Sequence, residues 1–408
     1  METVKVLDNV YWVGALDCDI RDFHGYRTSD GSTYNAYLII DEKITLIDTV
    51  KAPFVPELLA RISEIVDPKK IDQVVSNHAE FDHSSGLPQV MAQIGADKPV
   101  YSSKMGEKAL KAQMPDCRAL NFKTVGSGDS LSLGRLSLKF LETRMVHWPD
   151  SMFSFCPELG ILFSQDAFGM HLATSRRFDD EVGRNVWGYE ALKYYANILT
   201  PYSGVIDKLL QAVASSGLMN QVKIICPDHG IIWRSNPGEI VGLYQKWVKQ
   251  TPTRKAVLVY DSMWKSTEKM ALELSGTLSG QGVLVKLMNM KYNHRSDVVT
   301  EIFNAGAVLV GSPTINNDVY PTVAEVMAYM RGLKFMNKIG AAFGSYGWSG
   351  EAPKIVQTQL AGMKYQMVSP ELRVQWLPDE SALPPIRDLA RAVADALPRE
   401  PVGADFGL

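Results

Sequence analysis

The chain is poor in the features of cysteine-rich and membrane proteins. Its four cysteines, at positions 18, 117, 156 and 226, are scattered and form no CxxC pair. This spacing argues against a zinc ribbon, a rubredoxin-like iron centre and a disulfide framework, and it suits a reducing cytoplasm. No apolar run approaches the roughly 20 residues that a membrane-spanning helix needs. The charged start, METVKVLD, lacks the apolar core of a signal peptide.

Neither basic nor acidic residues are in large excess. The sequence has 42 Lys and Arg against 45 Asp and Glu, a formal charge of −3. Because nucleic-acid binding needs a clustered basic surface, we expect no nucleic-acid partner, and we expect no membrane partner either. A chain of 408 residues suggests two or three domains, at roughly 100 to 200 residues each. The hydrophobic fraction of 46% is ordinary for globular proteins.

Histidine is scarce, but it is concentrated. Six of the seven histidines lie at or before position 229. The stretch 78–83, HAEFDH, follows a predicted buried strand over 71–76 and precedes a plausible helix entry that contains Pro88. Four potential metal ligands within six residues would cost free energy if they were buried unpaired. We therefore interpret this stretch as a metal-binding turn rather than a solvated loop.

Later strands of the first half end in further candidate ligands. The predicted strands over 136–142, 161–164 and 222–225 lead to His147, Asp166 and His229. A lone histidine after a strand is usually structural, but the ends of neighbouring strands converge in space, so the repetition favours one site. Seven ligands suffice for two metals, which such sites hold about 3.5 to 4 Å apart, and Asp166 could bridge them. Asp48, at the end of a predicted strand over 44–47, could brace the metal-binding loop.

The second half shows a regular alternation of predicted strands and helices. After a connector near Thr251, strands predicted over 255–260, 283–288, 307–310, 339–343 and 372–376 alternate with helices over 268–279, 322–331, 353–361 and 385–396. This alternation predicts a doubly wound parallel sheet, whose ligands bind at the carboxyl ends of the strands. Three loops follow strands there, over 261–268, 311–317 and 344–350. The first opens a helix with hydroxyls and backbone N–H groups, which is typical of a phosphate cradle.

The ligand pattern resembles a known family. His78-x-Glu80-x-Asp82-His83 with His147, Asp166 and His229 resembles the metallo-β-lactamase fold, and in particular the flavodiiron proteins, also called A-type flavoproteins. The common hydrolases of this fold carry a histidine where this chain has Glu80. A hard oxygen donor in place of an imidazole makes the site less zinc-like and better suited to iron.

The resemblance implies a fold and a set of ligands. It implies a metallo-β-lactamase-like αββα sandwich over residues 1–250 and a flavodoxin-like domain over 251–402. His78, Glu80 and His147 would hold one iron, Asp82 and His229 the other, and Asp166 would bridge them. His83 binds the second iron in some members and turns away in others. His24, His171 and Tyr195 would orient ligands or supply protons, or would be hydrogen-bonded structural residues.

The three loops resemble the FMN site of a flavodoxin. The first would take the phosphate, and the other two would frame the isoalloxazine ring. Trp264, Tyr346 and Trp348 are candidates to stack on the flavin, whereas Lys265 is left without a role. The cofactor-binding residues expected from these loops are Ser262, Met263, Trp264, Ser266, Thr267, Pro313, Thr314, Asn316, Asn317, Ser345, Tyr346, Gly347, Trp348 and Gly350.

The implied activity is a cytoplasmic oxidoreductase. The diiron site as a whole can supply two electrons and FMN two more, and these four electrons reduce O2 to water. Reduction of NO to N2O is the alternative. A zinc hydrolase and a non-catalytic electron-carrier module are the rival classes, and metal content separates iron from zinc. The sequence to Leu408 shows no paired cysteines, so we expect no fused rubredoxin domain and a separate donor, such as rubredoxin or another small carrier. By resemblance, the assembly is a head-to-tail homodimer or a tetramer.

Overall fold

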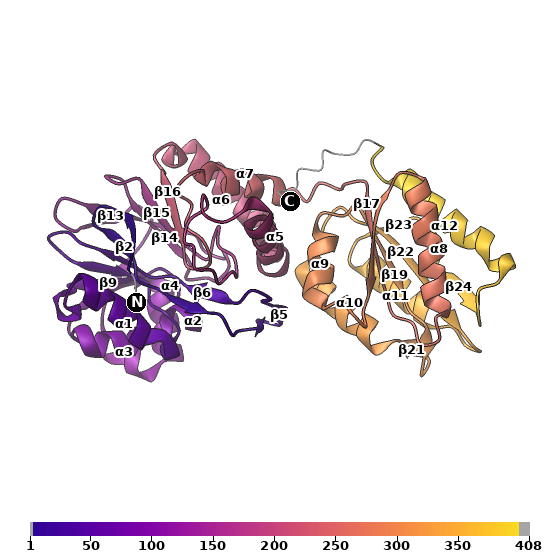
Figure 1. Cartoon of the computed structure of the whole chain (residues 1–408), viewed down its shortest axis with the longest axis horizontal. Helices are drawn as coiled ribbons and strands as arrows, with labels where there is room; N and C mark the ends of the chain where they lie inside the picture. Colours follow the sequence, from indigo (N-terminus) through magenta and orange to yellow (C-terminus); the bar gives the residue numbers. More distant parts are fainter. Residues whose placement is uncertain (1–2, 400–408) are drawn as a thin grey trace. The chain divides into compact units, whose positions relative to one another are not determined.

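The structure, a computed structural model, describes residues 3–399, and its contacts divide the chain into two compact units (Figure 1). The first unit contains the residues up to Phe23, Thr28–Tyr194 and Tyr202–Gln245. The second contains His24–Arg27, Tyr195–Pro201 and the residues from Lys246 onward. Two short segments of the first half of the sequence therefore pack with the second unit. Residues 400–402, the expected end of the second domain, lie outside the described residues.

The first unit is built on two sheets. The seven-stranded sheet has the order β1-β2-β7-β8-β9-β10-β11, and the five-stranded sheet has the order β12-β13-β14-β15-β16. In sequence order these strands are β1 Val4–Leu7, β2 Val10–Trp12, β7 Tyr37–Ile39, β8 Thr45–Ile47, β9 Gln73–Ser76, β10 Pro99–Ser103, β11 Asn121–Val125, β12 Ser130–Ser132, β13 Ser137–Glu142, β14 Met152–Cys156, β15 Ile161–Gln165 and β16 Ile224–Pro227.

Side chains from both sheets form the core between them. Trp12, Ile39 and Val75 of the larger sheet belong to the same buried cluster as Phe140 and Phe163 of the smaller one. The opposite face of the larger sheet packs against helices, because its alternate side chains point the other way. The fold is a metallo-β-lactamase-like sandwich with helices outside both sheets (Figure 1), as predicted.

The helices of the first half cover these sheets. Those that pack on the larger sheet include α1 and α3, which contribute Leu58, Ile62 and Val90 to its outer core. The helices are α1 Val55–Ile65, α2 Phe81–Ser84, α3 Leu87–Ile94, α4 Lys104–Gln113, α5 Arg184–Tyr194, α6 Ser203–Ser215 and α7 Pro237–Trp247. A π-helix, Tyr195–Leu199, directly follows α5. Short pairs are formed by β3 Ala15–Asp17 with β6 Ser32–Tyr34 and by β4 Asp22–Phe23 with β5 Tyr26–Arg27.

The second unit is the predicted doubly wound parallel sheet. Its strand order is β18-β17-β19-β22-β23, with β24 also beside β22, and every pair is parallel. Figure 1 shows α9 and α10 on one side of the sheet and α8 and α12 on the other. The elements are β17 Lys255–Tyr260, α8 Ser266–Gly280, β18 Leu284–Asn289, α9 Arg295–Phe303, β19 Ala307–Gly311, β20 Thr314–Ile315, β21 Asp318–Val319, α10 Pro321–Leu333, β22 Ile339–Tyr346, α11 Ala352–Gly362, β23 Gln366–Met367, β24 Leu372–Gln375 and α12 Leu383–Ala396.

Some elements differ from the sequence-based expectation. The expected helices of the second half are present within one or two residues, but α9 was not predicted. In the first half, the short strands β3 to β6, the strands β11, β12 and β14, and the helices α5 to α7 were not predicted either. Among residues 3–399, no helix is both long and apolar enough to cross a membrane.

Candidate functional site

The metal-binding turn lies between β9 and α3. After β9 ends at Ser76, the chain passes through His78 and Glu80 into the short helix α2, which carries Asp82 and His83. Gly86 then lets the chain pass close to the preceding loop, because a Cβ there would lie 2.4 Å from the carbonyl oxygen of Val50. The turn is thereby packed against the loop that follows β8, and its polar side chains are buried.

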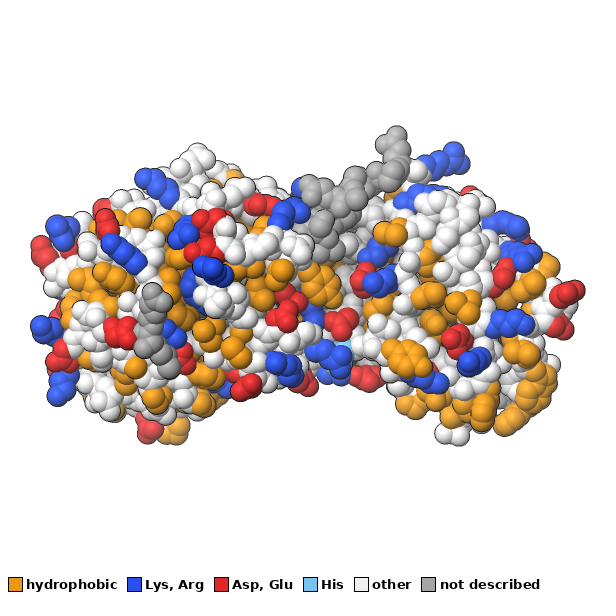
Figure 2. All heavy atoms as spheres, in the orientation of Figure 1, with side chains coloured by type: hydrophobic (Ala, Val, Ile, Leu, Met, Phe, Trp, Pro, Cys, Tyr) orange, Lys and Arg blue, Asp and Glu red, His pale blue; other side chains and the backbone are white. Residues whose placement is uncertain are grey.

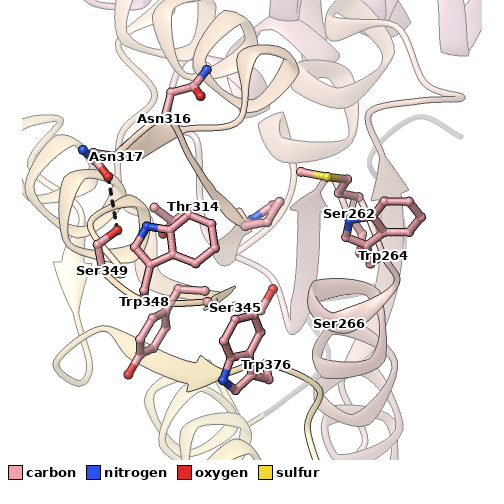
Figure 3. A pocket seen from close by; sticks show the side chains of 14 residues that line it. Ser262, Trp264, Ser266, Thr314, Asn316, Asn317, Ser345, Trp348, Ser349 and Trp376 are labelled. Atoms are coloured by element: carbon pink, nitrogen blue, oxygen red, sulfur yellow. Dashed lines mark hydrogen bonds between the residues drawn. The ribbon is translucent and has the colours of Figure 1, made fainter.

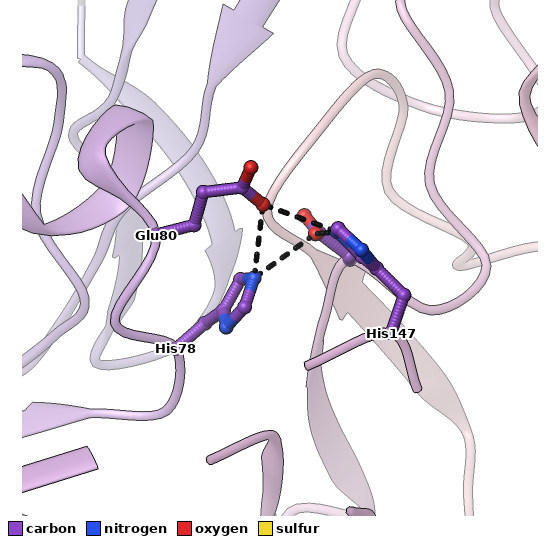
Figure 4. A group of neighbouring side chains, drawn as sticks. His78, Glu80 and His147 are labelled. Carbon is purple, nitrogen blue, oxygen red and sulfur yellow. Dashed lines mark hydrogen bonds and ion pairs between the residues drawn. The ribbon is translucent and has the colours of Figure 1, made fainter. Parts of the chain in front are cut away.

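The first group of donors is His78, Glu80, His147 and Asp166. Figure 4 shows the side chains of His78 and Glu80, from one turn, and of His147, from another segment, pointing toward one another. His147 Nε2 lies 3.1 Å from Glu80 Oε2 and 3.0 Å from Asp166 Oδ2. His78 Nε2 lies 3.3 Å from each of the same two oxygens. One ion at the centre could therefore contact all four side chains.

The second group of donors faces the other oxygen of Asp166. His83 Nε2 lies 3.1 Å from Asp82 Oδ2 and 3.1 Å from Asp166 Oδ1. His229 Nε2 lies 3.1 Å from Asp82 Oδ2 and 3.5 Å from Asp166 Oδ1. Asp166 thus presents one oxygen to each group, which is the geometry of a bridging carboxylate. His83 points into the site in this structure.

The donor atoms fit a pair of cations better than they fit one another. Both carboxylate oxygens of Asp82 and both ring nitrogens of His83 are buried without a hydrogen-bond partner among the described residues. The short N···O separation between these two residues, 3.1 Å, is therefore not a hydrogen bond. Buried groups of this kind are costly unless they are paired or coordinate a metal. Imidazole and carboxylate donors together suit iron.

Burial and mutual attraction shift the titration of these groups. Burial raises the pKa of Glu80, but hydrogen bonds from His147 and His78 outweigh burial and lower this pKa to about 2. Burial lowers the pKa of His147, and hydrogen bonds with Asp166 and Glu80 reverse the effect and raise it to about 9. Protons on the imidazoles thus balance the carboxylates. A metal ion would displace these protons, so its binding favours higher pH.

Neighbouring groups fix the direction in which several ligands point. Asp150 Oδ2 lies 3.1 Å from His78 Nδ1 and accepts the backbone N–H of Ala79 at 2.6 Å. The Thr33 carbonyl oxygen lies 2.5 Å from His229 Nδ1. In both histidines, Nε2 is therefore left for the metal. Asp150 was not predicted as a site residue, although it lies only three residues after His147.

The predicted brace by Asp48 is confirmed. Its carboxylate accepts both the backbone N–H of Asn77, at 2.6 Å, and the Asn77 side-chain amide, at 2.8 Å. Asn77 immediately precedes His78, so the brace fixes the start of the metal-binding turn. Burial raises the pKa of Asp48 to about 6, and the hydrogen bonds to Asn77 oppose this shift.

Of the three expected outer residues, His171 packs against a predicted ligand. Its Nδ1 lies 2.8 Å from Ser32 Oγ, and its ring centre is 4.6 Å from that of His229. His24 lies in the turn between β4 and β5, with φ +57°, and clusters with the second unit. Tyr195 also belongs to the second unit, where its ring packs against Trp247 and Phe303.

Tyr194, which was not predicted, lies beside two histidines of this region. The Tyr194 ring centre is 5.1 Å from that of His171 and 6.2 Å from that of His229. Burial raises the pKa of its hydroxyl well above the usual range, and Asp166 adds to this shift. Tyr194 therefore remains a neutral phenol. Tyr194 is thus a further candidate residue of this site, and the role of Tyr195 stays a prediction.

The second candidate site is a cavity of about 300 Å³ at the carboxyl ends of the strands of the second unit. It is lined by all three predicted loops, and Figure 3 shows Trp264 and Trp348 on opposite sides of it. The predicted residues that line it are Ser262, Met263, Trp264, Ser266, Pro313, Thr314, Asn316, Asn317, Ser345, Tyr346, Gly347 and Trp348. Ser349 and Trp376 also line it and were not predicted.

Two predicted flavin residues lie behind the wall of the cavity. The hydroxyl of Thr267 is buried and 2.8 Å from that of Ser345. Gly350 has φ +82°, and a Cβ there would meet the ring of Tyr346 at 3.0 Å. Both residues support the cavity wall rather than line it.

The cavity fits a flavin phosphate. At the start of α8, Ser262 and Ser266 line the cavity, and Lys265 adopts a left-handed conformation with φ +67°. Among the described residues that line the cavity, none is acidic. Free N–H groups at the start of a helix attract anions, and hydroxyls add donors. The aromatic walls suit a flat ring system.

Comparisons with known proteins agree with the fold of both units. Residues 33–230 match the family model described as ODP family beta lactamase, and residues 258–388 match that of flavodoxin. A nitric oxide reductase of Moorella thermoacetica is 46% identical over 396 residues, which span 96% of this chain and 98% of the relative.

Two solved structures have the same fold throughout. The rubredoxin oxygen:oxidoreductase of Desulfovibrio gigas has a TM-score of 0.93 and 41% identity, over 97% of this chain and 98% of its own. The flavodiiron protein of Giardia intestinalis has a TM-score of 0.92 and 35% identity, over 97% of this chain and 96% of its own.

Proposed function

The chain belongs to the flavodiiron protein family, and from this premise we propose that it is an oxidoreductase that reduces O2 to water with electrons passed through FMN to a diiron centre. The observation that carries this proposal is the presence in one chain of a two-group donor cluster and a flavodoxin-type cavity. When bound, FMN and two irons together supply four electrons, the number that O2 needs to become two waters.

We propose that the two donor groups divide the irons between them. His78, Glu80 and His147 would hold one iron, and Asp82, His83 and His229 the other, with Asp166 as the bridge. The proposal rests on the separations of 3.0 to 3.5 Å between these donors and on the two oxygens of Asp166, each of which faces one group. It assigns His83 as a ligand because its ring points into the site.

The side chains of the first group admit a small molecule. The side chains of His147 and Glu80 are 12% and 10% exposed, whereas those of His78, His83, Asp82 and Asp166 are at most 3% exposed. A diatomic substrate would therefore reach the centre on the side of His147. The phenol of Tyr194 and the imidazole of His171 lie behind His229, where they hold its ring in place.

A reductive test separates the main proposal from its alternative. NO reduction is the second candidate because a relative 46% identical to this chain is named a nitric oxide reductase. The purified protein, loaded with iron and FMN and reduced without oxygen, should consume O2 with four electrons each and release no peroxide. Faster turnover of NO, with N2O as the product, would favour the alternative. Zinc in place of two irons per chain would contradict both.

We propose rubredoxin, or another small acidic carrier, as the electron donor. A relative 42% identical to this chain is named rubredoxin-oxygen oxidoreductase. Residues 254–294 carry six basic against three acidic side chains, but Lys255 is buried against Glu301. Three lysines remain near the flavin cavity: Lys265, Lys291 and Lys269. Figure 2 shows basic and acidic side chains interspersed over this unit, so the steering is modest.

Salt tests the donor proposal, because exposed charges are screened beyond about 8 Å at physiological ionic strength. The rate of carrier oxidation should fall as salt rises, while the rate with a small uncharged reductant should not. Equal rates at low and high salt would contradict an electrostatically guided donor.

We propose a head-to-tail homodimer, in which the FMN of one subunit serves the diiron centre of the other. Cyclic dimers are the commonest oligomers, and each cofactor site here lies on its own unit of the chain. We also propose the cytoplasm as the compartment, because the four cysteines are free thiols, the state that a reducing compartment maintains.

A further inference from the structure

A fourth segment reaches the flavin cavity, in addition to the three loops that the sequence predicts. It spans residues 375–378, directly at the end of β24. Its Trp376 lines the cavity, and Figure 3 shows this indole near Trp348, on the side of the loop that carries Ser345. The two indole ring centres are 6.4 Å apart, with 56° between the planes. No flavodoxin-type loop predicted from the sequence includes this residue.

The backbone of Trp376 is unusual for a bulky residue. Its φ is +59°, in the left-handed region that large side chains rarely adopt. The conformation lets its N–H donate to the carbonyl oxygen of Tyr346 at 2.7 Å. Such outliers persist only where surrounding contacts hold them, and they cluster at ligand sites. The left-handed backbone of Trp376 is thus a feature typical of a ligand site.

Contacts on both sides hold this segment in place. Gln375 Nε2 donates to the carbonyl oxygen of Gly347 at 2.8 Å, in the loop expected to frame the flavin ring. Lys269 Nζ donates to the carbonyl oxygen of Pro378 at 2.6 Å, from the helix whose start forms the phosphate cradle. The segment thus connects the two ends of the cavity.

Gly347 makes room for the indole. A Cβ on Gly347 would lie 2.9 Å from the ring of Trp376. Any larger residue would push the indole off the loop. Trp376 itself stays 61% exposed instead of packing into the core. A large apolar ring is thus kept available at the cavity wall.

We propose that Trp376 is a flavin-binding residue, whose indole packs against the isoalloxazine ring of bound FMN and shields it from water. The inference rests on FMN as the cofactor of the second unit. Flat aromatic systems attract one another beyond simple burial of area, so the contact adds affinity and quenches flavin fluorescence. Gly347 and the left-handed backbone of Trp376 are the features that place the indole.

The test is FMN binding by the full-length protein after removal of its flavin. Trp376→Ala should raise the Kd for FMN about tenfold and leave part of the FMN fluorescence unquenched at saturation. Trp376→Phe should retain most of the affinity. Gly347→Ala keeps the indole but displaces it, so it should weaken FMN binding in the same direction. The matched control is Leu377→Ala, the next residue, which is 60% exposed and does not line the cavity.

Two results would overturn the inference. The first is wild-type affinity and full quenching in Trp376→Ala. The second is a lower unfolding temperature of the flavin-free Trp376→Ala protein together with full quenching at saturation, since the residue would then only support the loop. If the wild-type protein takes up no FMN at all, the proposed function fails, and this inference fails with it.

Discussion

Removing the charge of Asp150 tests how the metal cluster is held. Asp150 Oδ2 serves two partners, His78 Nδ1 at 3.1 Å and the N–H of Ala79 at 2.6 Å, and the residue is only 3% exposed. Asp150→Asn keeps the shape but turns charge-assisted hydrogen bonds into neutral ones. Charge-assisted bonds contribute about 1.5 to 3 kcal/mol and neutral ones about 0.5 to 1.5 kcal/mol, so the loss is about 1 to 1.5 kcal/mol.

That loss corresponds to roughly tenfold weaker iron binding in the group that contains His78. Asp150→Ala should weaken binding further, toward about 100-fold, because it frees the imidazole altogether. The assay is iron retained against a graded chelator, with FMN content measured in parallel and expected to stay constant. Asp41→Asn is the matched control, since Asp41 accepts the N–H of Leu136 and contacts Arg135 rather than a ligand. Wild-type iron retention in Asp150→Asn would refute the reasoning.

Three further predictions follow from other parts of the molecule. Glu80→His should shift the metal bound in an iron and zinc competition toward zinc and abolish gas reduction, with FMN unchanged; an unaltered metal ratio would contradict the role given to the carboxylate. Burial, aided by Lys255, lowers the pKa of Lys338 to about 7. The unfolded lysine keeps its proton to about pH 10.4, so above pH 7 the unfolded state binds more protons than the folded state. The free energy of unfolding of the wild type should therefore rise relative to that of Lys338→Met, by at most about 1.4 kcal/mol per pH unit. The same difference in urea midpoint between wild type and variant at pH 6 and at pH 9 would contradict this. Dilution to monomers should leave both cofactors bound but slow turnover, and a fully active monomer in sedimentation and rate measurements would exclude the dimer.

The sequence predicts the metal cluster well because its signals are local. His78, Asp166 and His229 lie at or just beyond the ends of β9, β15 and β16. The ends of such strands can be predicted from apolar runs in the sequence. The structure brings these residues into one buried site. The three flavin loops can be predicted for the same reason, because each follows a parallel strand.

Features that depend on how distant segments pack against one another could not be predicted from the sequence. Helix α5 is buried on several sides, so no polar face indicates that Tyr194 lies near the predicted metal ligands. The π-helix that begins at Tyr195 shifts the register further. Helix α9 begins after His294, whose ring accepts the N–H of Ser296, and histidine is not a common capping residue.

Asp150 and Trp376 illustrate the same limit. Asp150 is one of 45 acidic residues, and only the folded loop shows that it lies behind His78. Trp376 ends a predicted strand, and its place in the cavity depends on the pairing of β24 with the carboxyl half of β22. Such roles arise from contacts between distant segments, which a single sequence does not encode in its local pattern.

Two segments of the first half of the chain pack with the second unit. This packing limits how the protein can be recombined with a relative. Asn197, in the π-helix, donates to the carbonyl oxygen of Ser296 and to the hydroxyl of Thr300, and Tyr195 packs on Phe303. A chimera joined near residue 250 would take these partners from different parents. Viable exchange therefore requires that the π-helix and α9 be inherited together, so the genetic module boundary does not coincide with a single cut in the sequence.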